Sequence, residues 1–246
     1  MIFDGALLTN RCWLSATFEP NLYQDDSAQP SIDNLLSSFI RTAMTIFAHS
    51  LNPIGFNMHC RLPYQLTTDH VRHAMQDWLT FWQLINQQLQ DHALPYLEHW
   101  LMPATISGMV GEFISTRLPL YCSQLVKNRY PNGHPDLIPK GMFPEDAIQY
   151  AREGIEIKAS RHASGWQGHN LEAVWLMVFQ ISTHTASQRD HTIHYTPFRF
   201  KAVYAALLEQ SDWSFSGRSS TSRRTITATI NRQGMAKLRE NWVYRE

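Results

Sequence analysis

The chain has 246 residues, of which 43% are hydrophobic and 12% aromatic, a composition typical of a folded globular protein with a sizeable core. Lys and Arg together number 21, as do Asp and Glu, so the formal net charge is zero. A protein that coats nucleic acid without selectivity is basic. Any DNA contact of this chain must therefore come from a local concentration of positive charge.

The cysteines and the first residues indicate the compartment. Cys12, Cys60 and Cys122 lie far apart without metal-ligand spacing, which is typical of free thiols in a reducing environment. The chain does not begin with a basic segment followed by an apolar one, so we expect no signal peptide. No apolar run approaches the roughly 18 residues that a membrane span requires. We expect a cytoplasmic protein without membrane contact.

The first part of the chain has helical periodicity. Apolar residues recur at helical spacing, and capping signals occur at Ser31 and at Thr68-Asp69. Helices are expected over 31–47, 68–89, 94–101 and 106–130, the last interrupted at Pro119. We assign residues 1–105 to a helical region that serves as a scaffold and could supply a dimer surface.

The second part, residues 106–246, is predicted to hold the core of the protein. After the turn cluster at 130–135 the pattern changes to β-prone runs. Strands are expected over 154–160, 174–182, 198–207 and 224–230, and a closing helix over 234–242. Helices followed by strands with helices beside them predict an α/β (α+β) fold with a central mixed β-sheet flanked by helices.

Three polar side chains in this part have the chemistry of a divalent-metal site. Because alternate residues of a strand face opposite sides, Glu156 and Lys158 share one face, while Ile155 and Ile157 face the core. Asp136 follows the turn cluster and can arrive from a neighbouring strand. Carboxylates are ligands for Mg²⁺, which activates water against a phosphodiester. The lysine would orient or deprotonate that water and stabilise charge. The alternative is a surface strand with a cross-strand ion pair.

The sequence Pro135-Asp136, followed by Glu156-Ile157-Lys158, resembles the motif of the PD-(D/E)xK nuclease superfamily, particularly of type II restriction endonucleases. The resemblance implies a mixed sheet flanked by helices, with the acid and the acid-x-Lys on adjacent strands. It implies Mg²⁺-dependent cleavage of double-stranded DNA. Asp136, Glu156 and the Ile157 carbonyl would be metal ligands, and Lys158 would be the catalytic lysine.

Other acids leave alternatives open. Many members of the superfamily carry a glutamate on the helix before the first motif strand, which matches Glu112 here and implies a catalytic role, although a helical glutamate is equally expected to be solvent-exposed. Glu145 and Asp146 could replace Asp136 as ligand. They follow Pro144, where acids favour the N-terminus of a short helix, and we interpret them as caps.

Two polar segments have the composition of DNA-contact loops. Arg, Gln and Asn side chains read base edges, and glycines permit close approach of the backbone. The first segment supplies Arg161, His162, Trp166, Gln167, His169 and Asn170, and the second supplies Arg218, Ser219, Ser220, Thr221, Arg223 and Arg224. The alternatives are a tight turn with a packed tryptophan and a flexible linker. Gln167 could instead act on the attacking water or on a phosphate.

Together these features predict a sequence-specific, Mg²⁺-dependent endonuclease of the type II restriction class. We expect a homodimer if its site is palindromic, and a functional pairing with a cognate DNA methyltransferase. A repair or structure-specific nuclease with the same core is one alternative, and a DNA-binding module without catalysis is another. No H-E-x-x-H or paired Cys-x-x-Cys motif indicates a zinc site.

Overall fold

The computed structural model describes residues 51–168, 172–183, 197–215 and 228–246. The chain divides into two compact units, Met1–Ile46 and Phe47–Glu246, and all described residues belong to the second. The boundary expected near residue 105 falls inside this second unit. The helix expected over 31–47 lies outside the described residues.

The secondary structure follows most of the predicted elements and adds several short strands. The helices are α2 (Thr68–Asp91), α3 (Leu97–Trp100), α4 (Pro103–Tyr121) and α5 (Arg232–Glu240), with 3-10 turns η2 (Pro53–Gly55), η3 (Pro144–Asp146) and η4 (Gln210–Asp212). The strands are β1 (Leu125–Lys127), β2 (Leu137–Pro139), β3 (Ile155–Ser160), β4 (Gln167–Gly168), β5 (Trp175–Ser182), β6 (Arg199–Leu207), β7 (Trp213–Phe215), β8 (Ala228–Ile230) and β9 (Trp242–Arg245).

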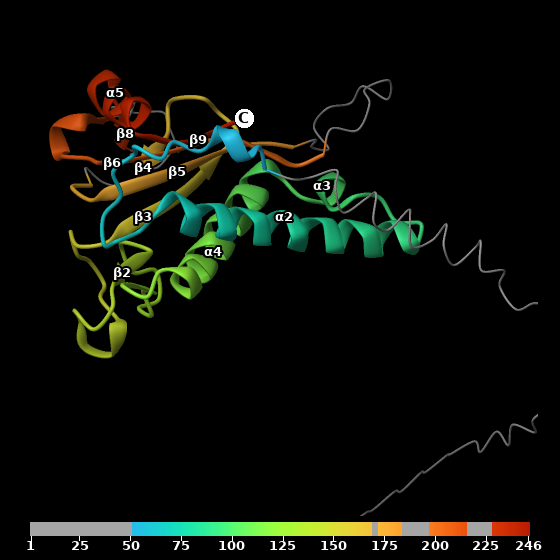
Figure 1. The fold of residues 1–246 in the computed structure, drawn as a ribbon, viewed down its shortest axis with the longest axis horizontal. Helices are drawn as coiled ribbons and strands as arrows, with labels where there is room; N and C mark the ends of the chain where they lie inside the picture. The colour runs from blue at the N-terminus through green and yellow to red at the C-terminus, as the bar shows by residue number, and fades with distance from the viewer. Residues whose placement is uncertain (1–50, 169–171, 184–196, 216–227) are drawn as a thin grey trace, which may run out of the picture. The chain divides into compact units, whose positions relative to one another are not determined.

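The strands of the described residues form two sheets. The main sheet has six strands in the order β1-β2-β3-β5-β6-β9, and the second has three in the order β4-β8-β7. In the main sheet β3 and β5 are parallel, while the other neighbours are antiparallel. This mixed sheet flanked by helices (Figure 1) confirms the expected α/β fold class.

Helices cover both faces of the main sheet. On one face α2 and α4 lie side by side, and their apolar stripes pack with Ile155, Ile157 and Met177 in one core. On the other face α5 and the second sheet pack with Leu176 and Val178 in a separate core. Alternate residues of β3 and β5 therefore belong to different layers, as the strand pattern requires.

The two long helices show what sequence periodicity resolves. The side chain of Thr67, one residue before the predicted cap, accepts a hydrogen bond from His70 N and begins α2. The interruption expected at Pro119 was wrong, because α4 continues through this residue to Tyr121. A proline this near the helix end removes only one backbone hydrogen bond of the last turn.

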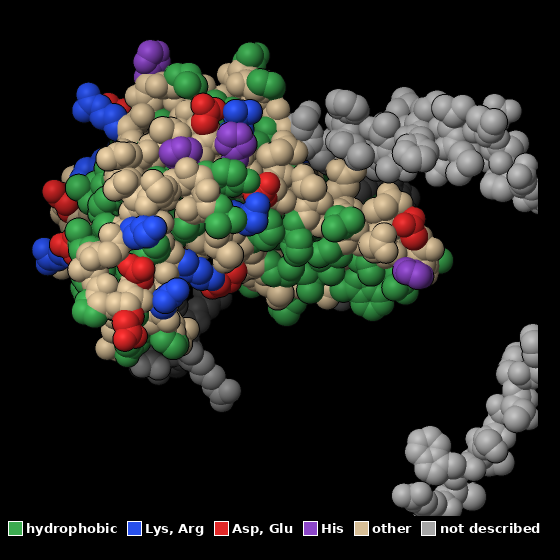
Figure 2. All heavy atoms as spheres, turned by 60° about the horizontal axis from the view of Figure 1, so that its bottom comes forward, with side chains coloured by type: hydrophobic (Ala, Val, Ile, Leu, Met, Phe, Trp, Pro, Cys, Tyr) green, Lys and Arg blue, Asp and Glu red, His purple; other side chains and the backbone are tan. Residues whose placement is uncertain are grey.

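The surface differs between the two ends of the unit. Figure 2 shows Lys and Arg side chains interspersed with Asp and Glu over the part that holds the sheets, whereas hydrophobic side chains gather over the helical end. Leu84, Leu94, Trp100 and Met102 are among the exposed apolar residues there. Among the described residues no helix is long and apolar enough to cross a membrane.

Candidate active site

The two motif acids meet across neighbouring antiparallel strands. Leu137 of β2 pairs with Ile155 of β3. Extending this register by one residue places Asp136 opposite Glu156, with both side chains on the same face of the sheet. Asp136 Oδ2 accepts a hydrogen bond from Ile157 N at 2.8 Å, which fixes the carboxylate against the edge of β3. The residues that the sequence placed on adjacent strands are therefore in contact.

Two residues outside the motif hold the Asp136 segment in place. The buried side chain of Asn128 donates to the carbonyl oxygens of Pro135 and Ile148, at 3.0 and 2.8 Å. Gly154 has a φ of +140°, and a Cβ at this position would lie 2.1 Å from the carbonyl oxygen of Leu137. Only glycine lets the start of β3 approach β2 this closely.

Glu156 is held between a lysine and a histidine. Its Oε1 lies 2.8 Å from Lys158 Nζ, and its Oε2 lies 3.0 Å from His134 Nδ1. The three side chains are 12–19% exposed, so water screens the contacts only weakly. The ring of His134 also stacks on Tyr150, with the ring centroids 5.5 Å apart. The carboxylate therefore has a fixed position and two positive partners when His134 is protonated.

The carboxyl groups have opposite pKa shifts. Burial, together with the nearby charge of Glu156, raises the pKa of Asp136 to about 7, against the hydrogen bond from Ile157. Burial alone would raise the pKa of Glu156 as well, but His134 and Lys158 lower it to about 2. One acid is thus ionised while its neighbour holds a proton at mildly acidic pH, a pattern that often marks functional sites.

The two basic groups keep their protons more firmly than usual. Burial alone would lower the pKa of Lys158, but the charges of Glu156 and Glu172 raise it. Burial alone would likewise lower the pKa of His134, and its hydrogen bond to Glu156 raises it. Lys158 is therefore a cation in this arrangement, which favours charge stabilisation over proton abstraction.

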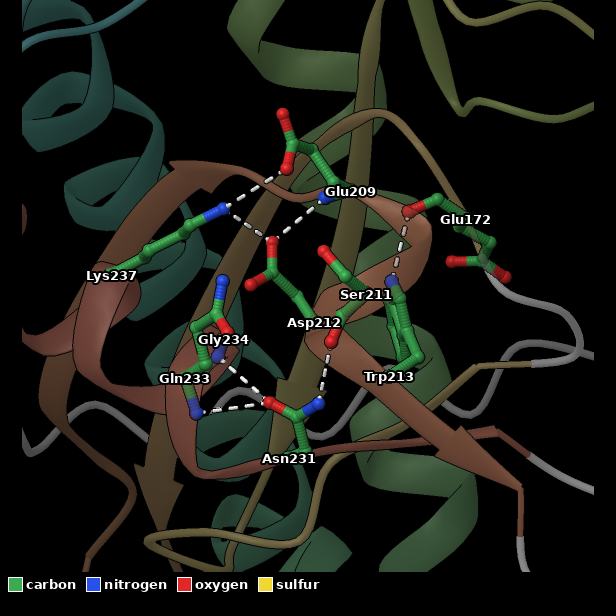
Figure 3. Close-up of polar contacts among 9 residues, drawn as sticks. All are labelled: Glu172, Glu209, Ser211, Asp212, Trp213, Asn231, Gln233, Gly234 and Lys237. Atoms are coloured by element: carbon green, nitrogen blue, oxygen red, sulfur yellow. Dashed lines mark hydrogen bonds and ion pairs between the residues drawn. The ribbon is translucent and has the colours of Figure 1, made fainter.

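A third acid, Glu172, arrives from the segment before β5. Its side chain is 2% exposed, and its backbone carbonyl accepts a hydrogen bond from Trp213 Nε1 at 2.9 Å (Figure 3). A Cβ at Gly168 would lie 3.0 Å from Glu172 Oε1, so glycine there leaves room for the carboxylate. One ligand atom each from His134, Glu156 and Glu172 lie within 4.8 Å of one another.

The oxygen groups around Asp136 and Glu156 fit a divalent cation. Burial and the charge of Glu156 raise the pKa of Asp136 although Lys158 lowers it, so a cation bound between the two carboxylates would relieve their repulsion. The N–H and C=O of one residue point to the same edge of a strand, so the Ile157 carbonyl faces the edge on which Asp136 lies. Asp136, Glu156 and this carbonyl would hold Mg²⁺, which prefers hard oxygen ligands.

Glu112 does not join this group. It lies on α4, which covers the opposite face of the sheet from Glu156. Its side chain is 74% exposed, and Oε2 forms an ion pair with Lys127 Nζ at 2.7 Å. Glu112 acts on Asp136 only through its charge, as the smallest of the contributions that raise the Asp136 pKa. The structure therefore places it as an exposed helix residue, the alternative that the sequence left open.

Glu145 and Asp146 also lie apart from the motif acids, in the turn η3. Asp146 Oδ1 accepts a hydrogen bond from Gly141 N at 2.8 Å, so its carboxylate closes the local loop. Glu145 is exposed. The geometry therefore favours Asp136 as the ligand, because its carboxylate lies against β3.

The first contact segment leads directly away from the site. Lys158, Ser160, His162, Ser164 and Gln167 line a groove of about 480 Å³ next to the motif lysine. His162 and Gln167 are exposed, and Arg161 is half-buried. His169 and Asn170 lie outside the described residues, as do Arg218, Ser219, Ser220, Thr221, Arg223 and Arg224 of the second segment.

Trp166 corrects one expectation for this segment. Its side chain is 3% exposed, its Nε1 donates to the carbonyl oxygen of His162 at 2.9 Å, and its ring packs on Tyr204. It is thus part of the core with the second sheet, although the residue also lines the groove beside Lys158. The tight turn with a packed tryptophan was the correct alternative for this residue.

A second acid–lysine pair lies beside the small sheet (Figure 3). Asp212 is fully buried, and its Oδ2 accepts hydrogen bonds from Lys237 Nζ at 2.6 Å and from Glu209 N at 2.8 Å. Its Oδ1 has no partner among the described residues. Next to it, the side chain of Asn231 accepts from the N-terminal amides of α5. This group ties α5 to η4 and contains one buried carboxylate.

Sequence reasoning missed His134 and Glu172. His134 precedes Asp136 by two residues, but it lies in the turn before β2, so the alternation of side chains in a strand did not predict its position. Glu172 has no local signal, because the fold alone brings it to the site. Comparison of the chain with family models, with curated proteins and with solved structures gave no match.

Proposed function

We propose that this protein is a Mg²⁺-dependent endonuclease that cuts double-stranded DNA at specific sequences. The observation that carries the proposal is the meeting of Asp136 and Glu156 on one sheet face, with the Lys158 ammonium 2.8 Å from Glu156. Such a group combines two carboxylates for a hard cation with one fixed positive charge. This combination of groups suits Mg²⁺-dependent hydrolysis of a phosphodiester.

Each side chain has a defined task in this proposal. Asp136 and Glu156 hold the ion, and bound Mg²⁺ supplies a Lewis acid and a more acidic water. Lys158 stays protonated and faces the position where negative charge develops on the phosphate. Electrostatic stabilisation of the charged transition state is usually the largest single contribution to catalysis. Its contact with Glu156 fixes the ammonium beside the scissile bond.

The groove beside Lys158 supports DNA as the substrate. It is lined by exposed polar groups of the segment after β3, including His162, Ser164 and Gln167. Hydroxyl, imidazole and amide groups donate to phosphates or read base edges. Because Lys158 lines the groove, a strand bound in it would pass the ammonium that lies 2.8 Å from Glu156.

The test uses the full chain with supercoiled plasmid and Mg²⁺. We expect discrete fragments from the wild type and none from Asp136→Asn. Glu145→Gln is the matched control, since Glu145 lies in the same region, is exposed and is outside the site. Cleavage by Asp136→Asn at the wild-type rate would contradict the site.

The same protein variants distinguish the endonuclease from a DNA-binding module without catalysis. Gel-shift assays in Ca²⁺, which supports binding without cleavage, report binding of each variant to the plasmid fragments. Wild-type binding without any cleavage in Mg²⁺ or Mn²⁺ would favour the binding module. Cleavage lost in Asp136→Asn with binding retained would support the endonuclease.

A further inference from the structure

The acids near Lys158 outnumber the groups that balance them. Asp136, Glu156 and Glu172 contribute three carboxyls, whereas Lys158 and His134 contribute at most two positive charges. The Mg²⁺ site proposed above uses the oxygen ligands of Asp136 and Glu156. Glu172 and His134 are the two remaining ionisable residues, and the endonuclease proposal gives them no role.

His134 is placed as a metal-ligating histidine. Its Nδ1 faces the Glu156 carboxylate at 3.0 Å, while its Nε2 is buried and has no hydrogen-bond partner among the described residues. Nδ1, the nitrogen that faces Glu156, is therefore the ring atom that can share an ion with this carboxylate, since Nε2 points away from it across the ring. Stacking on Tyr150 holds the ring in this orientation.

Three separate segments bring the remaining ligands together. His134 comes from the turn before β2, Glu156 from β3 and Glu172 from the segment before β5. One ligand atom of each lies within 4.8 Å of the others, which suits a common ion after small side-chain movements. Trp213, through its bond to the Glu172 carbonyl, anchors the least local of the three.

We propose that His134, Glu156 and Glu172 form a second divalent-cation site, which shares Glu156 with the Asp136 site and takes a transition ion such as Mn²⁺. The imidazole decides the class of ion, because Mg²⁺ and Ca²⁺ select oxygen ligands, whereas Mn²⁺ and later ions accept nitrogen. This inference goes beyond the proposed function, since it concerns the binding of an ion and does not require cleavage.

The test is electron spin-echo spectroscopy of the full chain at saturating Mn²⁺. A directly coordinated imidazole gives a ¹⁴N modulation, which oxygen ligands do not produce. We expect this modulation in the wild type, its loss in His134→Gln and its retention in His162→Gln, the matched control with an exposed histidine. Glu172→Gln should weaken Mn²⁺ binding at this position by at least about tenfold.

Two outcomes would overturn the proposal: no ¹⁴N modulation in the wild type, or modulation that persists in His134→Gln. The wild-type measurement needs no substitution, so a variant that fails to fold does not block the test. Asp136→Asn separates this proposal from the endonuclease, because it should lose cleavage and keep the modulation. A wild type that shows the modulation but cuts no DNA would leave the second site standing and remove the nuclease.

Discussion

Glu156 with Lys158 and Asp212 with Lys237 are both short ion pairs, 2.8 and 2.6 Å long, yet their surroundings differ. Asp212 is a single buried acid that faces one lysine and accepts a backbone amide of its own turn. Glu156 has two further acids near it, the half-buried Asp136 and the buried Glu172. The comparison teaches that a buried ion pair is a candidate functional site when it has more carboxylates around it than the nearby lysines and backbone amides can neutralise or hydrogen-bond.

The largest expected effect separates the two lysines by activity. Lys158→Ala should lower the cleavage rate on the order of 10²–10³-fold, because it removes the fixed positive charge at the reacting phosphate. Lys237→Ala should cleave at the wild-type rate, since this lysine contacts Asp212 and Glu209 and is not part of the candidate site. Single-turnover cleavage of a plasmid measures both. Equal losses in the two variants would show that the clusters do not differ in function.

The second prediction concerns stability, for which Lys237 is the lysine expected to matter. Lys237→Ala leaves the fully buried Asp212 without its cation, which should lower the free energy of unfolding by about 1–3 kcal/mol. This loss is smaller than the cost of breaking a fully buried ion pair, because the Lys237 side chain is 34% exposed and water screens its charge. Urea unfolding measures it, with Lys140→Ala as the exposed control. A change under about 0.3 kcal/mol would contradict a structural role for this pair.

The fold could be predicted where strands were long. The runs that became β3, β5 and β6 combine β-prone residues with clear boundaries, and the burial of Ile155 and Ile157 follows their alternation. The strands β1, β2 and β7 have three residues each, too few for periodicity to separate them from loops. Their existence depends on tertiary pairing, so sequence reasoning could not find them.

The candidate site shows the same limit. Asp136, Glu156 and Lys158 could be chosen because their residue types and spacing have a chemical purpose. Glu112 was a weaker match, because an exposed helical glutamate was equally expected, and the packing of α4 on the opposite face separates it from the group. Glu172 depends on Trp213, which is distant in sequence and holds its carbonyl at 2.9 Å. Contacts of this kind have no signature in a single chain.

The third prediction uses pH, and it applies only to the metal site that we propose at Asp136. Asp136 has its pKa raised from 3.8 to about 7, so protons and Mg²⁺ compete for it. Mg²⁺ affinity should therefore rise with pH and level off near about pH 8, with roughly fivefold weaker binding at pH 6 than at pH 7. Calorimetric titration with Mg²⁺ measures this dependence. Affinity that is constant from pH 5.5 to 8 would contradict it.

The raised pKa of Asp136 also predicts how the stability of the metal-free protein changes with pH. The folded protein binds the Asp136 proton more tightly than the unfolded chain, so its stability should fall as pH rises from about 4 to about 7. Glu156 has the opposite shift, and its contribution is lost only as pH falls below 4.5 towards about 2. Asp136→Asn removes the first slope and serves as the control in thermal unfolding.

The smallest expected effect concerns Glu112, which pairs with Lys127 as an exposed acid–lysine contact and thus extends the comparison to a third pair. Glu112→Gln should lower the free energy of unfolding by only about 0.2–1 kcal/mol, since water screens a carboxylate that is 74% exposed. Cleavage should stay within roughly threefold of the wild type, because a helix on the opposite face of the sheet can affect Asp136 only through its weak charge. A loss above about tenfold, with unfolding unchanged, would mean that Glu112 reaches the metal site when DNA is bound.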